Sequence, residues 1–420
     1  MGELESERTV SGKQYVIIGG GLAGARAVQG IRRMDKEGGI VMVTADSEVP
    51  YHRPALSKGY LTGKEDLDHV YVKPSEYYVE QKVDLITSTR ATQIDRTAQQ
   101  VALEDGSVIS YDSLLLATGG RPWRLPIPGN DLRNVFTLRT LADADAIRRA
   151  GQSGERALVL GGSFIGSEVA SSLSQLGLRV SMVFPESRLL ERVVPEAFSH
   201  FLQLKYETAG IHILPGTKPE SLNGDEQVEW AVLENGETVD ADLVVMGVGI
   251  RLNTELAAEA GLEMDGRGGI VVDEYLRTSD PSIYAAGDIA SWPDVTFDKR
   301  LRVEHWDVAW RQGMRAGRNM AGEHKPYRTL PYFFSDLFDV SLEVWGDLSA
   351  WDRTVQRGKL ESGSYAFYYF HQENLVGVLA VNRPDSERDP MVSLVKTRPK
   401  LEDIGSKLAD ESSDLSALLG

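Results

Sequence analysis

The chain has 420 residues, 42% of them hydrophobic and 25% charged, which is long enough for two or three domains of ordinary globular composition. Its 62 acidic and 45 basic side chains give a formal net charge of −17, which disfavours binding to nucleic-acid phosphates and to anionic membranes, although such a charge can also serve solubility alone. There is no cysteine, which excludes disulfides, thiolate nucleophiles and cysteine-ligated metal clusters.

The N-terminal residues 1–13 are polar and acidic, unlike a signal or transit peptide. No apolar run approaches the roughly 20 residues that span a bilayer. The seven histidines are scattered and show no pairing typical of a metal site. We therefore expect a cytoplasmic protein with no membrane span, no nucleic-acid partner and no metal.

A strand–turn–helix–strand pattern opens the chain, with predicted strands at 15–18 and 40–44 around the glycine-rich turn 19–24. In such a turn the first glycine makes the bend, the second lets a pyrophosphate approach the backbone, and the third lets helix and strand pack closely. The free N–H groups at the helix start bind the anion. About 20 residues later, Asp46 can bind the ribose hydroxyls. A further buried strand that enters a turn is predicted at 114–120.

The same pattern recurs later, with predicted strands at 157–160 and 180–184 around the turn 161–166. Glu186 follows this turn about 20 residues later, as Asp46 follows the first. Two occurrences of the full pattern make a coincidence of glycine-rich loops unlikely and predict two dinucleotide sites. Ser163 replaces the middle glycine, and its hydroxyl would either weaken phosphate contact or donate a hydrogen bond.

Residues 283–286 form a predicted strand that places Asp288 at its C-terminal tip. Open α/β sheets bind ligands at this edge, and a carboxylate there suits the ribitol hydroxyls of FAD. The alternative is that Asp288 caps the start of a helix. After about residue 332 the sequence pattern changes and predicts strands of an antiparallel sheet, followed by polar helical turns at 401–419. These turns could touch a membrane, but their acidic composition favours a solvated surface helix.

Several short motifs are more specific than a glycine-rich turn. They are PYHRPALSK at 50–58, ATGGRP at 117–122, GSE at 166–168, FPE at 184–186, AGD at 286–288, RVEHW at 302–306 and PYFFSD at 331–336. Through them the chain resembles, over nearly its whole length, the family of apoptosis-inducing factor and bacterial ferredoxin reductases. That family consists of FAD-dependent pyridine nucleotide oxidoreductases.

The resemblance implies an α/β fold with two Rossmann-like dinucleotide-binding domains and a C-terminal α+β domain that contains an antiparallel sheet. The FAD-binding domain would be discontinuous, with residues 1–121 and 251–325. The NAD-binding domain would span 122–250, and the C-terminal domain 326–420.

The resemblance also implies the binding residues of both cofactors. FAD would be bound by Gly19, Gly21, Leu22, Ala23, Gly24, Ala45, Asp46, Arg53, Lys58, Ala91, Ala117, Thr118, Gly119, Arg139, Gly287 and Asp288, with His305, Trp306 and Phe334 beside the flavin ring. NAD would lie on the second turn with Gly162, Ser163, Phe164 and Ile165, with Glu186 at its adenine ribose and Gly249, Glu304, His305 and Glu343 near its other parts. Glu168 and Arg192 are further cofactor-binding candidates. Two positions depart from the family: Ala45 replaces an acid, and Phe334 replaces a frequent tryptophan.

Three side chains are candidates for the chemistry: Lys58, Glu168 and His305. The family places Lys58 and Glu168 as an ion pair by the flavin N5, where a fixed cation would stabilise developing charge. The alternative for each is a solvated surface charge. His305 and Trp306 lead into a predicted helix at 307–320, whose positive end would face the flavin N1/C2 carbonyl. The alternative for His305 is an ordinary residue at a helix start.

The predicted function is transfer of electrons from NADH through FAD to a ferredoxin-like or other one-electron acceptor, without a redox disulfide. Alternatives are a slow NADH sensor like apoptosis-inducing factor, or a reductase of quinones or monodehydroascorbate. Glu186 would favour NADH over NADPH, softened by nearby arginines. We expect a monomer or homodimer. An acceptor would dock on the helical stripe Arg311, Arg315 and Arg318, unless these arginines pair with Asp307 or with acids in neighbouring domains.

Overall fold

The structure, a computed structural model, describes residues 12–419. Its contacts divide the chain into two compact units. The first unit consists of the segment that ends at His52 together with Tyr71–Gly120 and Leu252–Thr329. The second unit consists of Arg53–Val70, Arg121–Arg251 and the segment that begins at Leu330. The boundaries expected for separate FAD, NAD and C-terminal domains stay a prediction.

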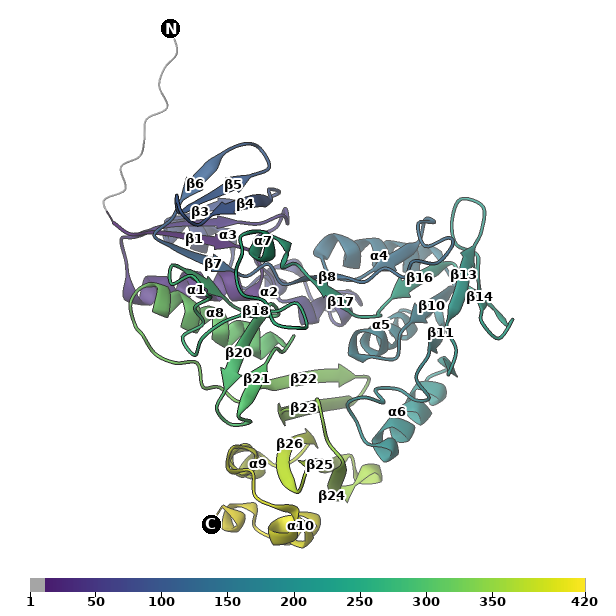
Figure 1. The fold of residues 1–420 in the computed structure, drawn as a ribbon. Helices are drawn as coiled ribbons and strands as arrows, with labels where there is room; N and C mark the ends of the chain where they lie inside the picture. The colour runs from purple at the N-terminus through teal and green to yellow at the C-terminus, as the bar shows by residue number, and fades with distance from the viewer. Residues whose placement is uncertain (1–11, 420) are drawn as a thin grey trace. The chain divides into compact units, whose positions relative to one another are not determined.

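The first unit is built on a five-stranded sheet with the order β19-β7-β1-β2-β3, in which all neighbouring strands pair in parallel. Strands β1, β3 and β7 of this sheet are labelled in Figure 1. Its central strands are continuous apolar runs, as expected where both faces of a parallel sheet are covered. The strands are β1 (Gln14–Ile18), β2 (Gly39–Val43), β3 (Val83–Ile86), β7 (Ser113–Leu116) and β19 (Ile283–Ala285).

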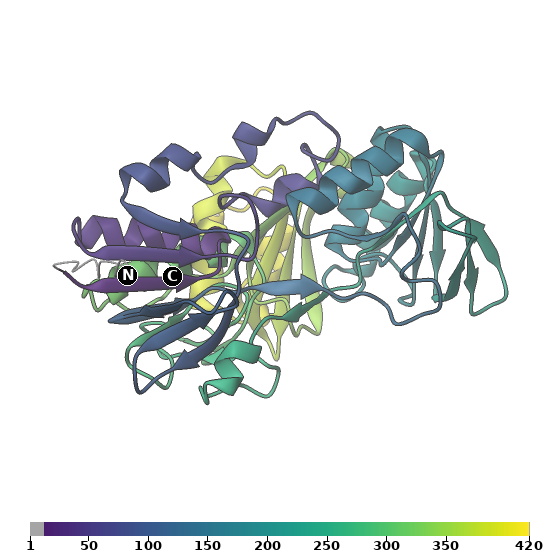
Figure 2. The ribbon, with the colours of Figure 1, turned by 90° about the horizontal axis from the view of Figure 1, so that it is seen from above.

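Helices α1 (Leu22–Met34) and α8 (Trp306–Met320) pack side by side in this unit (Figures 1 and 2). Both have a strongly one-sided distribution of apolar residues, so one face of each is buried. The unit also contains the short helices α3 (Ser75–Glu80) and α7 (Glu255–Glu259). The helix predicted at 307–320 is confirmed.

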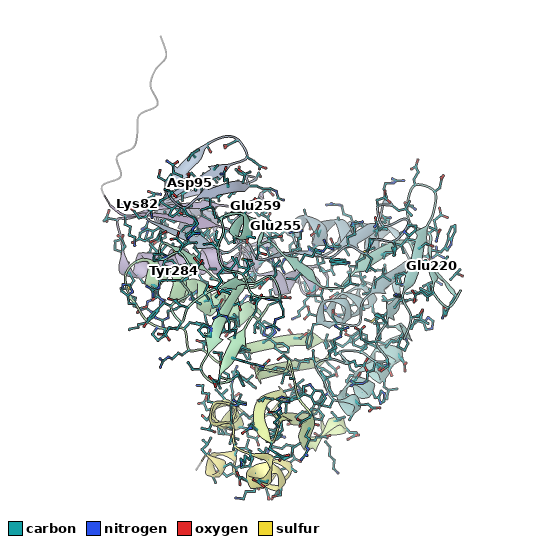
Figure 3. The ribbon with its side chains drawn as sticks, in the orientation of Figure 1. Lys82, Asp95, Glu220, Glu255, Glu259 and Tyr284 are labelled. Atoms are coloured by element: carbon teal, nitrogen blue, oxygen red, sulfur yellow. The ribbon has the colours of Figure 1, made fainter. Side chains whose placement is uncertain are left out.

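Two smaller sheets belong mainly to the first unit. One is antiparallel, with β4 (Ala91–Asp95), β5 (Gln100–Leu103) and β6 (Val108–Ser110). The other has the order β18-β20-β21, with β18 (Ile270–Val271), β20 (Ala290–Asp294) and β21 (Lys299–Leu301). Charged side chains such as those of Lys82 and Asp95 are exposed, whereas Tyr284 on β19 is buried (Figure 3).

The second unit repeats the parallel design with the strand order β12-β11-β10-β16-β9. The strands are β9 (Val135–Thr137), β10 (Arg156–Leu160), β11 (Arg179–Phe184), β12 (His212–Pro215) and β16 (Leu243–Met246). Helices are α4 (Leu141–Ser153), α5 (Phe164–Gln175) and α6 (Glu196–Thr208). An antiparallel sheet packs into the same apolar core, with β13 (Pro219–Asn223), β14 (Trp230–Leu233) and β15 (Thr238–Asp240).

The second unit also contains a five-stranded antiparallel sheet with the order β22-β23-β26-β25-β24. Its strands are β22 (Tyr332–Leu337), β23 (Val340–Gly346), β24 (Arg353–Lys359), β25 (Ser364–His371) and β26 (Asn374–Val381). The 3-10 turn η1 (Arg53–Ser57) and helix α2 (Leu67–Val70) lie in this unit, whereas β8 (Gly120–Pro122) and β17 (Ile250–Leu252) span the unit boundaries.

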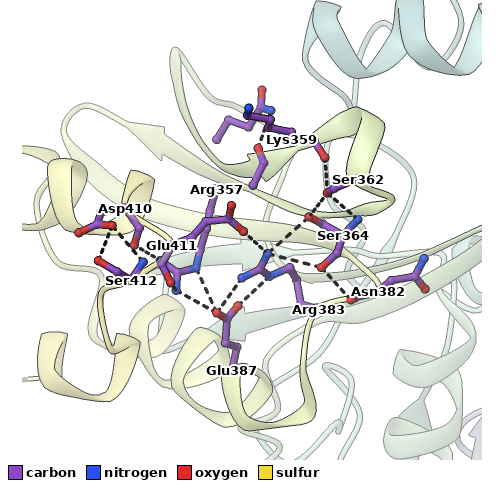
Figure 4. Close-up of polar contacts among 12 residues, drawn as sticks. Arg357, Lys359, Ser362, Ser364, Asn382, Arg383, Glu387, Asp410, Glu411 and Ser412 are labelled. Atoms are coloured by element: carbon purple, nitrogen blue, oxygen red, sulfur yellow. Dashed lines mark hydrogen bonds and ion pairs between the residues drawn. The ribbon is translucent and has the colours of Figure 1, made fainter.

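The chain ends in α9 (Asp385–Thr397), α10 (Leu401–Ala409) and the 3-10 turn η3 (Leu415–Leu418), while the turn η2 (Leu360–Ser362) precedes β25. The buried guanidinium of Arg357 pairs with Glu387 at 2.9 Å and donates to backbone carbonyls of the C-terminal segment, including those of Asp410 and Glu411 (Figure 4). Ile404 and Leu408 of α10 are buried in this unit, which favours a surface helix over a membrane-touching tail. No helix within residues 12–419 has the length and apolar character to cross a bilayer.

These elements confirm the expected fold class, with two parallel Rossmann-like sheets and a C-terminal antiparallel sheet.

Candidate functional site

The first glycine-rich turn connects β1 to α1 in the first unit. A Cβ placed on Gly19 would lie 2.2 Å from the carbonyl oxygen of Ala117, and one on Gly24 would lie 2.2 Å from that of Gly19. Both positions therefore require glycine, the first for the bend and the third for contact between helix and strand. A Cβ on Gly21, by contrast, would meet no described atom within 4 Å. This open backbone at a helix N-terminus fits a pyrophosphate group.

The topology brings further predicted residues to one edge of the first sheet. Because β1, β2, β7 and β19 are parallel, the loops after them share an edge, and these loops contain Gly19, Asp46, Thr118 and Asp288. Asp288 is followed by a turn and then by β20, so the alternative that it caps a helix is wrong. This set of carboxylates and backbone groups suits the ribose and ribitol hydroxyls of FAD.

Neighbouring groups hold these loops. The Tyr51 hydroxyl donates to the Asp46 carboxylate at 2.6 Å. The Thr118 hydroxyl donates to the carbonyl oxygen of Asn253 at 2.5 Å, and the Asn253 backbone N–H donates to that of Gly119 at 2.9 Å. The site edge of the first unit is therefore fixed by side chains as well as by the sheet.

The remaining predicted FAD residues of the first unit have varied surroundings. Leu22 begins α1, and the backbone of Ala23 lies against Gly313 of α8. The Gly287 N–H donates to the Gln312 side chain at 2.9 Å. Exposed Ala45 precedes Asp46, and Ala91 begins β4, outside the parallel sheet.

His305 and Trp306 mark the start of α8, with His305 at the N-cap position. The His305 side chain makes no capping hydrogen bond, so it does not serve as an ordinary helix cap. Burial lowers the pKa of His305 to about 4, while the Asp288 carboxylate opposes this shift. At neutral pH His305 is therefore an uncharged group beside that carboxylate.

Sequence reasoning missed a group of side chains around Trp306. Its indole N–H donates to Nδ1 of His52 at 3.0 Å, and its ring stacks on Trp310 at a centroid distance of 4.9 Å. The Arg26 guanidinium lies 3.6 Å from the centre of the Trp310 ring. Burial lowers the pKa of His52, and Arg26 lowers it further. The spacing of four between Trp306 and Trp310 was the available signal, since it places both on one helix face.

The second glycine-rich turn connects β10 to α5 in the second unit. A Cβ on Gly161 would lie 2.4 Å from the carbonyl oxygen of Gly247, and one on Gly166 would lie 2.1 Å from that of Gly161. The Ser163 hydroxyl donates to the Gly247 carbonyl at 3.1 Å. Its proton is thus engaged by the backbone and is not free for a phosphate. The turn retains the glycine contacts of a dinucleotide site and fits NAD.

Other predicted NAD residues of the second unit surround this turn. The Phe164 ring packs edge-on against Phe333 at 5.1 Å, and Ile165 is exposed. A Cβ on Gly162 would clash with the ring of Phe184 at 2.8 Å. Gly249 has a φ of 99°, within the range that favours glycine.

Glu186 follows β11 and forms an ion pair with Arg192 at 3.0 Å. Glu186 is 27% exposed and Arg192 is 83% exposed, so the arginine is held loosely. Glu343 accepts hydrogen bonds from Tyr332 at 2.7 Å and from Arg388 at 2.6 Å. These carboxylates therefore have different partners within the same unit.

Glu304, also predicted to contact NAD, lies in the first unit. It is exposed and pairs with Arg302 at 2.7 Å.

Lys58 and Glu168 form an ion pair inside the second unit, with Nζ 3.2 Å from Oε1. Glu168 is 6% exposed and Lys58 17% exposed, so the alternative of two solvated surface charges is wrong. Glu168 is the fifth residue of α5 and therefore lies beyond the helix's first turn. The ammonium also lies 3.2 Å from Asp336 and 5.0 Å from the centre of the Phe334 ring.

The pair is therefore part of a cluster with one cation and two carboxylates, and its formal charge is negative. Sequence reasoning missed Asp336, although it stands in the PYFFSD motif. The Lys58 ammonium is a positioned donor between carboxylates and not an isolated cation.

The predicted FAD residues are divided between the units. Arg53, Lys58, Arg139 and Phe334 belong to the second unit, and the others to the first. Arg53 begins η1, and the backbone N–H of Arg139 donates to Asp143 at 2.9 Å at the start of α4.

The predicted docking stripe on α8 is paired within the first unit. Arg311 bonds Asp307 at 2.7 Å, and Arg315 and Arg318 each lie 2.7 Å from Glu323. The alternative of pairing with Asp307 thus holds for Arg311, whereas Arg315 and Arg318 pair with an acid of their own unit and not with one in a neighbouring domain. Since Glu323 also binds Lys325, four cations share two carboxylates and the stripe retains a positive excess. Within residues 12–419 no cluster of three or more acidic or histidine side chains could hold a metal ion.

Comparison with known proteins places this geometry in a family. Residues 13–313 match the family described as pyridine nucleotide-disulphide oxidoreductase, and residues 332–419 match the reductase C-terminal family. The chain is 36% identical over 413 residues to putidaredoxin reductase CamA of Pseudomonas putida. This alignment covers 96% of each chain.

Solved structures agree with this match. A ferredoxin reductase from Rhodopseudomonas palustris superposes with a TM-score of 0.91 at 32% identity, covering 97% of this chain and 100% of the other. The covalent putidaredoxin reductase–putidaredoxin complex gives 0.91 at 34% identity, covering 97% and 98%.

Proposed function

Because this chain belongs to the pyridine nucleotide-disulphide oxidoreductase family and is an FAD-dependent oxidoreductase, we propose that it oxidises NADH and reduces a ferredoxin-type iron–sulfur protein. Bound FAD supplies the redox chemistry, since it accepts two electrons from a nicotinamide and can release them singly. The chain's own residues bind the two dinucleotides, orient them and fix the local charge.

One observation carries this proposal: two glycine-rich turns, both with the outer glycines of a dinucleotide site, occur in a chain without any cysteine. The turns fit two dinucleotides, and the lack of thiols removes the disulfide that would otherwise relay electrons. The acceptor therefore takes electrons from the flavin directly. This requirement favours a one-electron protein partner, as the names of the related reductases indicate for those proteins.

The second turn is the proposed NADH site, and Glu186 is the proposed determinant of NADH over NADPH. A carboxylate at this position accepts hydrogen bonds from both ribose hydroxyls and repels a 2′-phosphate. Arg192 neutralises part of that repulsion while it stays paired with Glu186. The preference should therefore be clear but not absolute.

We propose that three residues act where the hydride is transferred: Lys58, Glu168 and His305. The roles predicted for the other cofactor-binding residues are likewise proposals. The Lys58 ammonium is held by carboxylates, so its position is well defined for hydrogen bonding to a bound ring. Uncharged His305 would place a polar group next to the cofactor without adding a buried charge.

The acceptor is proposed to meet the α8 stripe of Arg311, Arg315 and Arg318. Its positive excess offers an acidic protein a local attraction on a chain of net charge −17. That the protein is located in the cytoplasm also stays a prediction.

The test is NADH-dependent turnover of the purified protein with ferredoxins, a rubredoxin, quinones and oxygen as separate acceptors. We expect a yellow protein that releases FAD on denaturation and reduces an acidic ferredoxin fastest, with a rate that falls as salt rises. A protein that binds no FAD would refute the oxidoreductase assignment. Fast reduction by NADH with reoxidation by quinones alone would replace the protein acceptor with a small one.

A further inference from the structure

The carboxylate of Glu168 is held by two serine hydroxyls as well as by Lys58. Ser57 donates to Oε2 at 2.5 Å, and Ser335 donates to Oε1 at 2.6 Å. Both serines are buried, with 1% of each exposed. Each carboxylate oxygen therefore has its own hydroxyl donor, and the side chain cannot rotate without breaking a buried hydrogen bond.

Two residues on one face of helix α5 form hydrogen bonds with the segment that contains Lys58. Glu168 and Ser172 are four apart, so their side chains project from the same side of the helix. Glu168 accepts from the Ser57 hydroxyl, and the Ser172 hydroxyl donates to the Ser57 carbonyl at 2.6 Å. The residue immediately before Lys58 is thus fixed through both its side chain and its backbone.

Ser335 reaches Glu168 from β22, which is an edge strand of the antiparallel sheet. Successive residues of a strand point to opposite faces, so Ser335 points away from Phe334 and Asp336. All three nevertheless contact the Lys58–Glu168 pair. Three successive residues of this edge strand therefore take part in the surroundings of the pair.

The other carboxylate near Lys58 is less restrained. Asp336 is 46% exposed and accepts one hydroxyl hydrogen bond, from Ser341 at 2.6 Å. Both carboxylates lie 3.2 Å from the Lys58 ammonium. The two carboxylates differ in that Glu168 is buried and accepts hydrogen bonds from two hydroxyls, whereas Asp336 is exposed to solvent.

We propose that Ser57 and Ser335 are positioning residues that hold Glu168, and through it the Lys58 ammonium, in a single arrangement for reaction with NADH. This inference rests on the proposed function for its kinetic consequence, but not for the positioning itself. Without these hydroxyl hydrogen bonds, the Glu168 side chain gains rotational freedom and Lys58 shifts toward Asp336. Catalysis that depends on placement is sensitive to such a displacement.

The first experiment measures the positioning without turnover. Acetylation of lysines by acetic anhydride is quantified by mass spectrometry in the FAD-loaded protein, with Lys64 as internal reference. We expect Ser335→Ala to raise labelling of Lys58 severalfold, because a loosened pair protects the amine less. The matched control is Ser199→Ala, which removes another fully buried serine hydroxyl in this unit, bonded to the Leu189 carbonyl.

The second experiment is stopped-flow reduction of the flavin by NADH. Ser335→Ala is expected to reduce the rate about tenfold, since loss of one buried hydrogen bond to a charged group commonly has an effect of this order. Ser335→Thr retains a hydroxyl and should recover most of the rate, and Ser57→Ala should resemble Ser335→Ala. Reoxidation by ferricyanide should not change in any of these variants.

The outcomes separate this inference from the proposed function. Unchanged Lys58 labelling in both Ser335→Ala and Ser57→Ala would overturn the positioning role. Equal slowing by Ser335→Ala, Ser335→Thr and Ser199→Ala would do the same, because it would show a general packing effect. If labelling responds as expected while NADH fails to reduce even the unaltered protein, the positioning stands and the proposed function falls.

Discussion

The two glycine-rich turns share their outer contacts and differ in the middle. In each, a Cβ on the first glycine would strike a carbonyl of a neighbouring strand's loop, and a Cβ on the last would strike the first glycine's carbonyl. Between them the first turn has Gly21 with open space, whereas the second has Ser163 bonded to Gly247. The outer glycines are therefore fixed by contacts within the protein, whereas Gly21 at the middle position meets no such contact.

The acidic residues that follow the two turns also differ, in the partner that each carboxylate has. Asp46 accepts from the neutral hydroxyl of Tyr51, whereas Glu186 pairs with the cation of Arg192. A neutral partner leaves the full carboxylate charge in the first site. The exposed cation beside Glu186 should, if this turn binds NADH as proposed, make the second site more tolerant of an added phosphate. The comparison teaches that one backbone design can serve two cofactors through a few side chains.

The largest effect should come from filling the space at the last glycine of each turn. Gly24→Val should give a colourless protein without FAD, because its Cβ would lie 2.2 Å from a backbone oxygen. Gly166→Val should remain yellow yet fail to be reduced by NADH. The flavin-to-protein absorbance ratio and stopped-flow reduction measure the two outcomes. Loss of FAD from both variants, or from neither, would break the assignment of one turn to each cofactor.

Loss of the positioned ammonium should have the next largest effect. Lys58→Ala should retain FAD but slow reduction by NADH about 100-fold, as is typical when a preorganised electrostatic group is removed. Lys64→Ala is the matched control, since Lys64 is an exposed lysine that bonds the neutral Gln175 at 2.7 Å. Stopped-flow traces with saturating NADH give both rates. Equal rates in the two variants would return Lys58 to a structural role.

A change at the acid of the second turn should shift the choice of nucleotide by about tenfold. Glu186→Ala removes the carboxylate and frees Arg192 for a 2′-phosphate, so the ratio of kcat/KM for NADH over NADPH should fall by about that factor. Glu191→Gln serves as control, because Glu191 is a nearby acid that bonds Ser187 instead. A ratio that stays constant in Glu186→Ala would exclude Glu186 as the specificity determinant.

The smallest effect should come from making the second turn like the first. Ser163→Gly removes the hydrogen bond to Gly247 and should raise the KM for NADH about twofold, in line with the modest net value of one such bond. FAD content should be unchanged. A steady-state titration with NADH is sufficient, and a marked fall in KM would mean that the serine hinders the phosphate.

Sequence alone determined the local parts of this protein. The strand–turn–helix units could be predicted because their signals are close in the chain: apolar runs, glycines at fixed offsets, and an acid about 20 residues later. The helix that begins at Trp306 and the strand before Asp288 were predicted for the same reason. Pairing of Arg311 with Asp307 was foreseeable as a contact between residues four apart.

Tertiary structure decided which charged side chains became a buried cluster. Ser57, Glu168 and Ser335 come from three segments separated by more than one hundred residues, and no local pattern joins them. The family motifs contain Ser57, Ser335 and Asp336, but only the fold shows that these residues contact Glu168 and Lys58. The same holds for Trp306 and His52, which lie in different segments of the first unit and are 254 residues apart in the chain. Long-range contacts of this kind depend on how sheets and helices pack, and a polar side chain reveals its partner only when burial removes water as the alternative.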